Sequence, residues 1–371
     1  MPRNIVVCCD GTANQFAVDR TNVVKLLYTL EHDPDTQVIY YHPGIGTMEA
    51  VGAVTKIGRR VTKLLGKAIG YGLETDIRDA YVFLMHNFQP CDRVYMFGFS
   101  RGAYTVRAVA SLLHMYGLIQ PGNEPLVPYA IRMMMAARKL QDRSAAGGNG
   151  KANEYFQLAD DFKDHFSIRN CKPHFVGIWD TVSSVGWIEN PLRLPWTANA
   201  PNIQVGRHAI AIDERRAFFR TNLWRPGKNG GPKDIKQVWF PGVHCDVGGG
   251  YPEDESGLSK LALEWMLREA TAHGLRVNPA RLGHVLGRTG RNAKPDPDGR
   301  MHESLKGAWH LAEFVPKRHY DWQKKKERRR MNLYRRRTIP DGALIHRSVF
   351  LREGGRYAKR LKLPPNYVIE D

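Results

Sequence analysis

One serine of this chain stands between two glycines in a pattern suited to nucleophilic chemistry. Gly98-Phe99-Ser100-Arg101-Gly102 fits the G-x-S-x-G elbow, a sharp strand-to-helix turn that exposes a serine hydroxyl. The strained turn requires small residues two positions to either side of the serine, which explains the glycines. An apolar run precedes the pattern and helical periodicity follows it, as the elbow requires. An ordinary strand-to-helix turn is the alternative interpretation.

A serine nucleophile needs a base to take its proton and a third group to orient that base. Two later runs supply both: Asp180 directly follows the apolar run 173–179, and His244 follows the run 235–242 in a Gly-rich loop. The carboxyl ends of strands are where open α/β sheets build their sites. We therefore expect Ser100 as nucleophile, Asp180 as orienting acid and His244 as general base.

Asp180 and His244 also have structural interpretations. Asp180 stands where it could cap a following helix, and His244 could be a buried structural histidine. Other histidines and aspartates near element ends are rival candidates for the base and the acid: His302, His346, Asp213 and Asp246. Chain order and placement at strand ends favour Asp180 and His244 over these rivals.

The turn Asp10-Gly11-Thr12 follows the first apolar run and is a candidate for half of an oxyanion hole. Gly11 permits close approach of a ligand, so an amide of this turn would join the amide of Arg101 at the helix start. The alternative is a plain turn in which Asp10 bonds its own backbone.

Short apolar runs and helical segments alternate along the chain. Strands are expected at 4–9, 36–41, 92–99, 173–179 and 235–242, and helices at 21–31, 71–88, 102–117 and 257–274. This alternation predicts an α/β fold with a mostly parallel central sheet and helices on both faces. We expect one catalytic domain over 1–371.

Two regions interrupt the alternation. Residues 118–170 form a helical insertion or cap, in which Met133 and Met134 are candidates to bind an acyl chain; packing in the core is the alternative. Residues 279–340 are a loop-rich basic region, and 279–300 lacks apolar periodicity.

The formal net charge of +18 is unevenly distributed, because nine of the residues 322–337 are basic and only Glu327 is acidic. Such a segment favours an anionic surface. A membrane is the preferred partner and nucleic acid the less favoured one; a solvated helix face is the alternative. The candidate contacts are Lys324, Lys325, Lys326, Arg328, Arg329 and Arg330.

The five cysteines include no CxxC pair, so reduced thiols are expected and no metal site is predicted. No apolar run approaches the roughly 20 residues that span a bilayer. The first residues lack the features of a signal peptide, which predicts a cytoplasmic protein. Export by a machine that needs no cleaved signal is compatible with the same sequence.

Four motifs together resemble one family. They are Asp10-Gly11-Thr12, the elbow with the next residue at 98–103, Trp179-Asp180-Thr181-Val182 and the stretch 242–251, "GVHCDVGGGY". The combination is similar to an α/β-hydrolase family, long carried as a domain of unknown function, that includes type VI secretion phospholipase effectors. The resemblance implies Ser100, Asp180 and His244 in the roles above, an ester or phospholipid-like substrate, and neither metal nor organic cofactor. The alternative to an enzyme is a binding protein: a non-catalytic or weakly catalytic scaffold that binds an anionic membrane or nucleic acid through its basic segment.

Overall fold

The computed structural model describes residues 2–11, 20–44, 56–144, 151–182, 186–187, 190–191, 194–225, 234–307, 309–321 and 326–371. Within these ranges, side chains are described for all residues except 56–71, 138–144, 151–155, 186–187, 190–191, 317–321 and 326–327.

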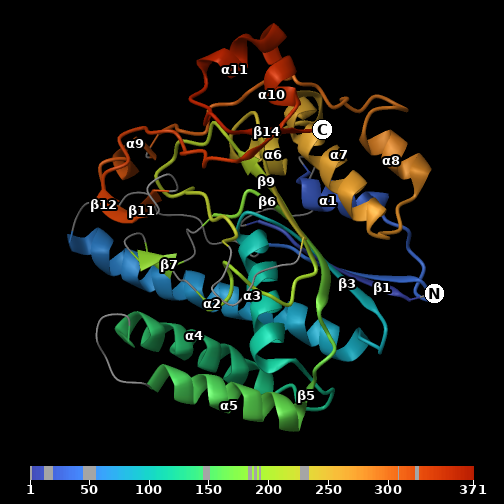
Figure 1. The fold of residues 1–371 in the computed structure, drawn as a ribbon, viewed down its shortest axis with the longest axis vertical. Coiled ribbons are helices and arrows are strands. Elements are labelled where there is room, and N and C mark those ends of the chain that lie inside the picture. The colour runs from blue at the N-terminus through green and yellow to red at the C-terminus, as the bar shows by residue number, and fades with distance from the viewer. Residues whose placement is uncertain are drawn as a thin grey trace.

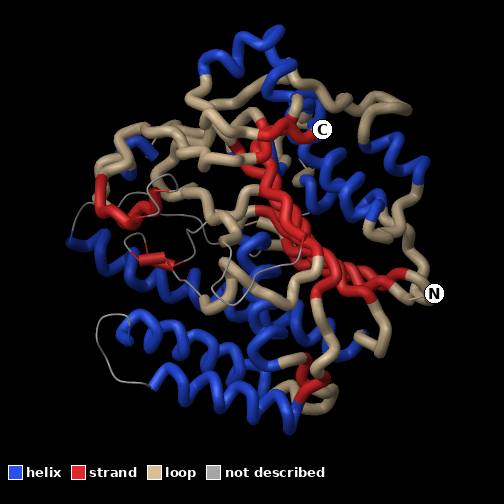
Figure 2. Tube along the Cα trace, in the orientation of Figure 1, coloured by secondary structure: helices blue, strands red, loops and turns tan. Residues whose placement is uncertain are grey.

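A sheet of eight parallel strands forms the centre of the described chain (Figure 2). Its strand order is β14-β13-β10-β9-β6-β3-β1-β2. In chain order the strands are β1 (Asn4–Cys9), β2 (Gln37–His42), β3 (Arg93–Phe99), β6 (Pro173–Trp179), β9 (Val205–Ala211), β10 (Asp234–Phe240), β13 (Leu344–His346) and β14 (Val368–Glu370). Because β1, β3 and β6 are neighbours, the residues that follow them lie at one edge of the sheet.

Helices cover both faces of the sheet (Figure 1), and the side chains of β1, β3 and β6 alternate between two buried clusters, one on each face. A third cluster joins β9, β10 and β13 to residues of the last helices. In β1, Ile5 and Val7 join one cluster, and Val6 and Cys8 join the other. The first cluster includes residues of α2 (Lys56–Asn87), α3 (Arg101–Tyr116), α4 (Leu126–Ser144) and α5 (Lys151–Phe166). The second includes residues of α1 (Asn22–Thr29), α6 (His244–Gly248), α7 (Gly257–Ala272) and α8 (Pro279–Val285).

Smaller elements lie outside these layers. Three two-stranded pairs are antiparallel: β4 (Leu118–Ile119) with β5 (Ser167–Ile168), β7 (Gly186–Trp187) with β8 (Asn190–Pro191), and β11 (Lys317–Asp321) with β12 (Lys326–Arg330). The remaining helices are α9 (Trp309–Ala312), α10 (Ser348–Leu351), α11 (Arg356–Arg360) and the 3₁₀ turns Glu253–Glu255 and Arg352–Gly355. No helix of the described residues has the length and apolar character to cross a membrane.

The predicted α/β architecture is confirmed, and the strands at 4–9 and 173–179 have the predicted bounds. The prediction of a loop over 279–300 is wrong at its start, where α8 forms. The Asn278 side chain accepts a hydrogen bond from the amide of Arg281 at 3.0 Å, and Pro279 occupies the first helical turn. Proline in the first turn favours the start of a helix.

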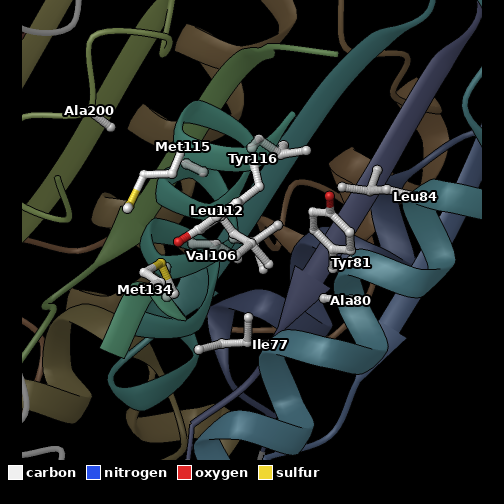
Figure 3. Close-up of a cluster of buried hydrophobic side chains, with 14 of the residues drawn as sticks. Ile77, Ala80, Tyr81, Leu84, Val106, Leu112, Met115, Tyr116, Met134 and Ala200 are labelled. Carbon is white, nitrogen blue, oxygen red and sulfur yellow. The ribbon is translucent and has the colours of Figure 1, made fainter. Parts of the chain in front are cut away.

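The methionines of the helical insertion pack inside the molecule. Met134 is 0% exposed and Met133 6% exposed, and both belong to the cluster between α2, α3, α4 and the sheet. Figure 3 shows Met134 beside Leu112 and Val106 in that cluster. This placement favours the core alternative for both residues over contact with an acyl chain.

Candidate active site

Ser100 stands at a strained corner between β3 and α3. Its φ of +56° lies in the left-handed region, which a residue with a side chain adopts only under structural constraint. The Ser100 amide donates to the carbonyl of Trp179 at 3.1 Å, which ties the corner to β6. Ser100 as a whole is half-buried at this corner.

The two elbow glycines are required by close packing. A Cβ on Gly98 would lie 2.5 Å from the carbonyl oxygen of Gly102, and a Cβ on Gly102 would lie 2.1 Å from that of Cys9. Real side chains do not tolerate these separations. The chain therefore brings the end of β1 directly against the start of α3 at the Ser100 corner.

Asp180 follows β6 at the same edge of the sheet, also with a positive φ, of +40°. It is 1% exposed, and its Oδ1 accepts the amide of Ala211 at 3.0 Å. Its Oδ2 lies 2.5 Å from Nδ1 of His244. The carboxylate is engaged by His244 and by the end of β9. For the alternative of a helix cap, no helix is found between β6 and β9 among the described residues.

His244 is the first residue of α6, directly after the β10 strand and its turn. Its amide donates to Glu214 at 3.2 Å. Its ring lies between Phe99, at 4.6 Å between ring centroids, and Phe219, at 4.8 Å. Since Nδ1 bonds Asp180, Nε2 is the nitrogen left for proton transfer. The ring contact with Phe99, the neighbour of Ser100, places the imidazole beside the elbow.

A buried arginine completes the site, and sequence reasoning missed its role. Arg337 belongs to the basic run 322–337, but its side chain is 1% exposed and both terminal nitrogens pair with the Asp180 carboxylate, Nη2 at 3.0 Å. The same guanidinium donates to the carbonyl oxygens of Ala211 and Phe219. In the sequence, Arg337 is one of three consecutive arginines, and nothing in their pattern indicates which of them is buried.

These contacts set opposite charge preferences on Asp180 and His244. Burial disfavours the carboxylate, but Arg337 and His244 together outweigh it and hold the pKa of Asp180 below its usual range. Burial also dominates at His244, where it lowers the imidazole pKa despite the Asp180 charge. The pair is thus an ionised carboxylate bonded to a neutral imidazole at neutral pH, as a general base requires.

The rival histidines and aspartates have other partners. His302 bonds Asp246 through Nδ1 at 2.6 Å and Glu255 through Nε2 at 2.8 Å. His346 bonds the hydroxyl of Ser348 at 2.8 Å. Asp213 accepts from the Tyr357 hydroxyl and from the amide of Gly242. Among these histidines, the structure pairs His244 with Asp180.

Of the three residues predicted to form the oxyanion hole, the structure describes Arg101 and Gly11. Arg101 is the first residue of α3, where a helix directs its positive end toward the elbow. The Gly11 amide donates to the Asp10 carboxylate at 2.7 Å, as in the plain-turn alternative, so this donor would have to exchange partners. Thr12 lies outside the described residues.

In the basic segment 322–337, the described residues 326–337 form strand β12 and a turn. They do not form the solvated helix that was the alternative interpretation. Lys326 begins β12, and Arg328 and Arg329 are exposed while Arg330 is half-buried. Lys324 and Lys325 lie outside the described residues. In the part of the chain that is described, no group of three or more His, Cys, Asp or Glu side chains is arranged to hold a metal.

Known proteins similar to this chain include one from a sequence comparison and two solved structures. An uncharacterized protein of Saccharomyces cerevisiae is 36% identical over 233 residues, which cover 60% of this chain and 33% of that protein. An uncharacterized protein from Pseudomonas aeruginosa has a similar structure, with a TM-score of 0.44, 18% identity, and coverage of 76% of this chain and 49% of that one. The Tle1 effector bound to the VgrG spike of the type 6 secretion system gives a TM-score of 0.34, 17% identity, and coverage of 69% and 52%.

The chain therefore spans about a third to a half of the relatives that it matches. A family model described as the catalytic domain of Tle1-like type VI secretion phospholipase effectors matches residues 3–269, more than half of this chain. That range contains Ser100, Asp180 and His244. The chain belongs to the Tle1-like phospholipase effector catalytic domain family.

Proposed function

We propose that this protein is a serine hydrolase that cleaves carboxylic esters of lipids, with Ser100, His244 and Asp180 as its catalytic triad. The observation that carries the proposal is the buried 2.5 Å contact between His244 Nδ1 and Asp180, placed beside a strained serine elbow. Membership of a phospholipase effector family supports an acyl ester of a phospholipid as the substrate class.

The reaction would begin when His244 Nε2 takes the proton of Ser100 as its oxygen bonds to the ester carbonyl carbon. Asp180 would hold the imidazole in the required tautomer and stabilise its charged form. The resulting oxyanion would lie at the start of α3, where each donated amide contributes about 3 kcal/mol. The imidazolium then gives its proton to the leaving alcohol, and the acyl group remains on Ser100.

Water completes the cycle. His244 removes a proton from it, the hydroxide oxygen bonds to the acyl carbon, and the bond to Ser100 breaks as the serine oxygen regains a proton. The products are a carboxylic acid and an alcohol. Each step uses only side chains of this chain and water, so the proposal requires no cofactor.

The proposed catalytic domain includes residues beyond the family match. Strands β13 and β14 belong to the central sheet, and Arg337 reaches Asp180 from the same part of the chain. We therefore treat 1–371 as one catalytic domain, with 118–170 as a helical insertion and 279–340 as a basic region that contributes Arg337.

The Ser100→Ala variant tests the proposal. It should lose at least about 10⁴-fold in kcat for a soluble short-chain p-nitrophenyl ester and for fatty-acid release from phosphatidylcholine in detergent micelles. The matched control is Ser111→Ala on the same helix, whose hydroxyl bonds the carbonyl of Arg107; it should keep wild-type rates. Ester hydrolysis that persists in folded Ser100→Ala protein contradicts the proposal.

A further inference from the structure

A surface near the candidate site combines exposed apolar side chains with arginines. Five large apolar side chains between residues 311 and 334 are 39–57% exposed: Leu311, Phe314, Met331, Leu333 and Tyr334. Three exposed arginines accompany them: Arg328, Arg329 and Arg335. We call these eight residues the cationic–apolar surface. Soluble proteins rarely gather this many exposed apolar side chains without a binding role.

Hydrogen bonds join the two segments of this surface. The carbonyl of Glu313 accepts the amides of Asn332 at 3.0 Å and Leu333 at 3.2 Å, and its carboxylate accepts the amide of Tyr334 at 2.8 Å. The rings of Phe314 and Tyr334 meet at 6.0 Å. The chain after β12 therefore runs beside the end of α9, in the same corner of the molecule (Figure 1).

This surface is connected to the catalytic histidine by packed rings. Trp309 at the start of α9 meets Phe219 at 5.5 Å, and Phe219 meets His244 at 4.8 Å. On the other side, Arg337 follows Tyr334 by three residues and bonds Asp180. A partner seated on the surface would thus lie beside the proposed site of ester cleavage.

The charge of the surface fits an anionic partner. Within 309–316 and 328–337, the only acidic residue is Glu313, and it is 0% exposed. Arg336 is not counted in this surface, because its charge is paired with Asp213 at 3.4 Å. We propose that the cationic–apolar surface docks on anionic phospholipid bilayers, with the apolar side chains entering the headgroup boundary and the arginines facing lipid phosphates.

The apolar component favours a bilayer over nucleic acid. Leucine and methionine side chains gain from transfer into the acyl boundary, whereas a phosphate backbone offers them no comparable environment. The inference rests on the proposed function, because docking would present a membrane-embedded ester to Ser100. The test therefore measures binding and soluble-ester hydrolysis separately.

Vesicle sedimentation tests the docking. Wild-type protein should sediment with phosphatidylcholine vesicles that contain about one third phosphatidylglycerol, and much less with pure phosphatidylcholine. The triple variant Leu311→Ser, Phe314→Ser, Leu333→Ser should bind the anionic vesicles at least about 10-fold more weakly. The double variant Arg328→Gln, Arg329→Gln should lose about 5-fold for each arginine removed.

Matched controls come from exposed residues elsewhere. Leu158→Ser with Leu351→Ser removes two leucines of 46% and 54% exposure and should bind as wild type. Lys359→Gln with Lys362→Gln removes two exposed cations and should also bind as wild type. All variants should hydrolyse the soluble ester at the wild-type rate, which shows that they are folded.

Three results would overturn the docking proposal. Wild-type protein would bind neither vesicle, or the surface variants would bind as well as wild type, or a short DNA duplex would bind and the anionic vesicles would not. Failure of the proposed function has a different signature: wild-type protein that sediments with anionic vesicles but hydrolyses no soluble ester.

Discussion

Arg335 and Arg337 belong to one basic run but lie in two different environments. Arg335 is exposed in the cationic–apolar surface, whereas Arg337 is buried against Asp180 at the carboxyl edge of the sheet. An exposed cation acts through a field that salt screens. A buried one fixes the ionisation and position of its partner. The comparison shows that the role of a charged residue in this protein follows from burial and partners, not from its place in a basic run.

The two environments also differ in energy. An exposed ion pair contributes about 0–1 kcal/mol, while removal of one partner from a buried pair costs about 3–5 kcal/mol because the other charge stays buried. Asp180 has a second cationic partner only when His244 is protonated. Arg337 is therefore the lasting counter-charge of the proposed catalytic acid.

Among the variants that test this comparison, Arg337→Met should have the largest effect. Loss of the positive guanidinium raises the pKa of both Asp180 and His244. The carboxylate also loses two hydrogen bonds that position it. We expect kcat for the soluble ester to fall about 10²- to 10³-fold with little change in KM. The acid limb of the kcat/KM profile should move to higher pH, which steady-state assays across pH will measure.

Two variants separate this positioning role from a loss of folding. Arg337→Lys keeps a cation and should recover part of kcat and return the acid limb toward the wild-type pH. Arg335→Met should leave soluble-ester kcat and its pH profile as they are. A purely structural role for Arg337 would lower the yield of active enzyme without moving the acid limb, and that outcome would contradict the comparison.

A smaller expected effect, on stability, compares the packing at the serine elbow with the packing beside the cationic–apolar surface. Gly102→Ala places a Cβ 2.1 Å from the Cys9 carbonyl oxygen, so the elbow must shift, and we expect a loss of about 3 kcal/mol in the free energy of unfolding. Gly307, just before α9, has no atom of the described residues within 4 Å of an added Cβ, but its φ is +56°. Gly307→Ala should cost only about 1 kcal/mol.

Urea denaturation of both glycine variants gives these values. Equal losses, or a larger loss for Gly307→Ala, would mean that the edge of the sheet is no more tightly packed than the surface beside it. The soluble-ester assay adds a second comparison, since only Gly102→Ala should also lower kcat by displacing Ser100.

Much of the fold could be predicted because its signals are local. The runs at 4–9 and 173–179 are continuous and apolar, as strands covered on both faces must be, and β1 and β6 formed there. Strand β9 was not predicted because Arg207 and His208 interrupt its apolar pattern. Arg207 is accommodated by ion pairs with Asp234 and Glu269, which are distant in sequence.

The candidate site was predictable to the extent that its residues follow strands. Ser100 and Asp180 come directly after predicted strands, and His244 comes two positions after one, so the parallel order of the sheet brings them to one edge. Arg337 does not directly follow a strand, and its partner is 157 positions away. Pairing across such a distance depends on how the whole chain folds, and nothing in the local sequence encodes it.

The most direct test of the account is the labelling of Ser100 by a fluorophosphonate, followed by mass spectrometry across pH. We predict one adduct on Ser100, absent from Ser100→Ala, with a labelling rate that falls on acidification at a midpoint below the usual imidazole pKa of 6.5, because burial lowers the pKa of His244. His244→Gln should slow labelling at least about 10²-fold. An adduct on another residue, or wild-type labelling in His244→Gln, would contradict the triad.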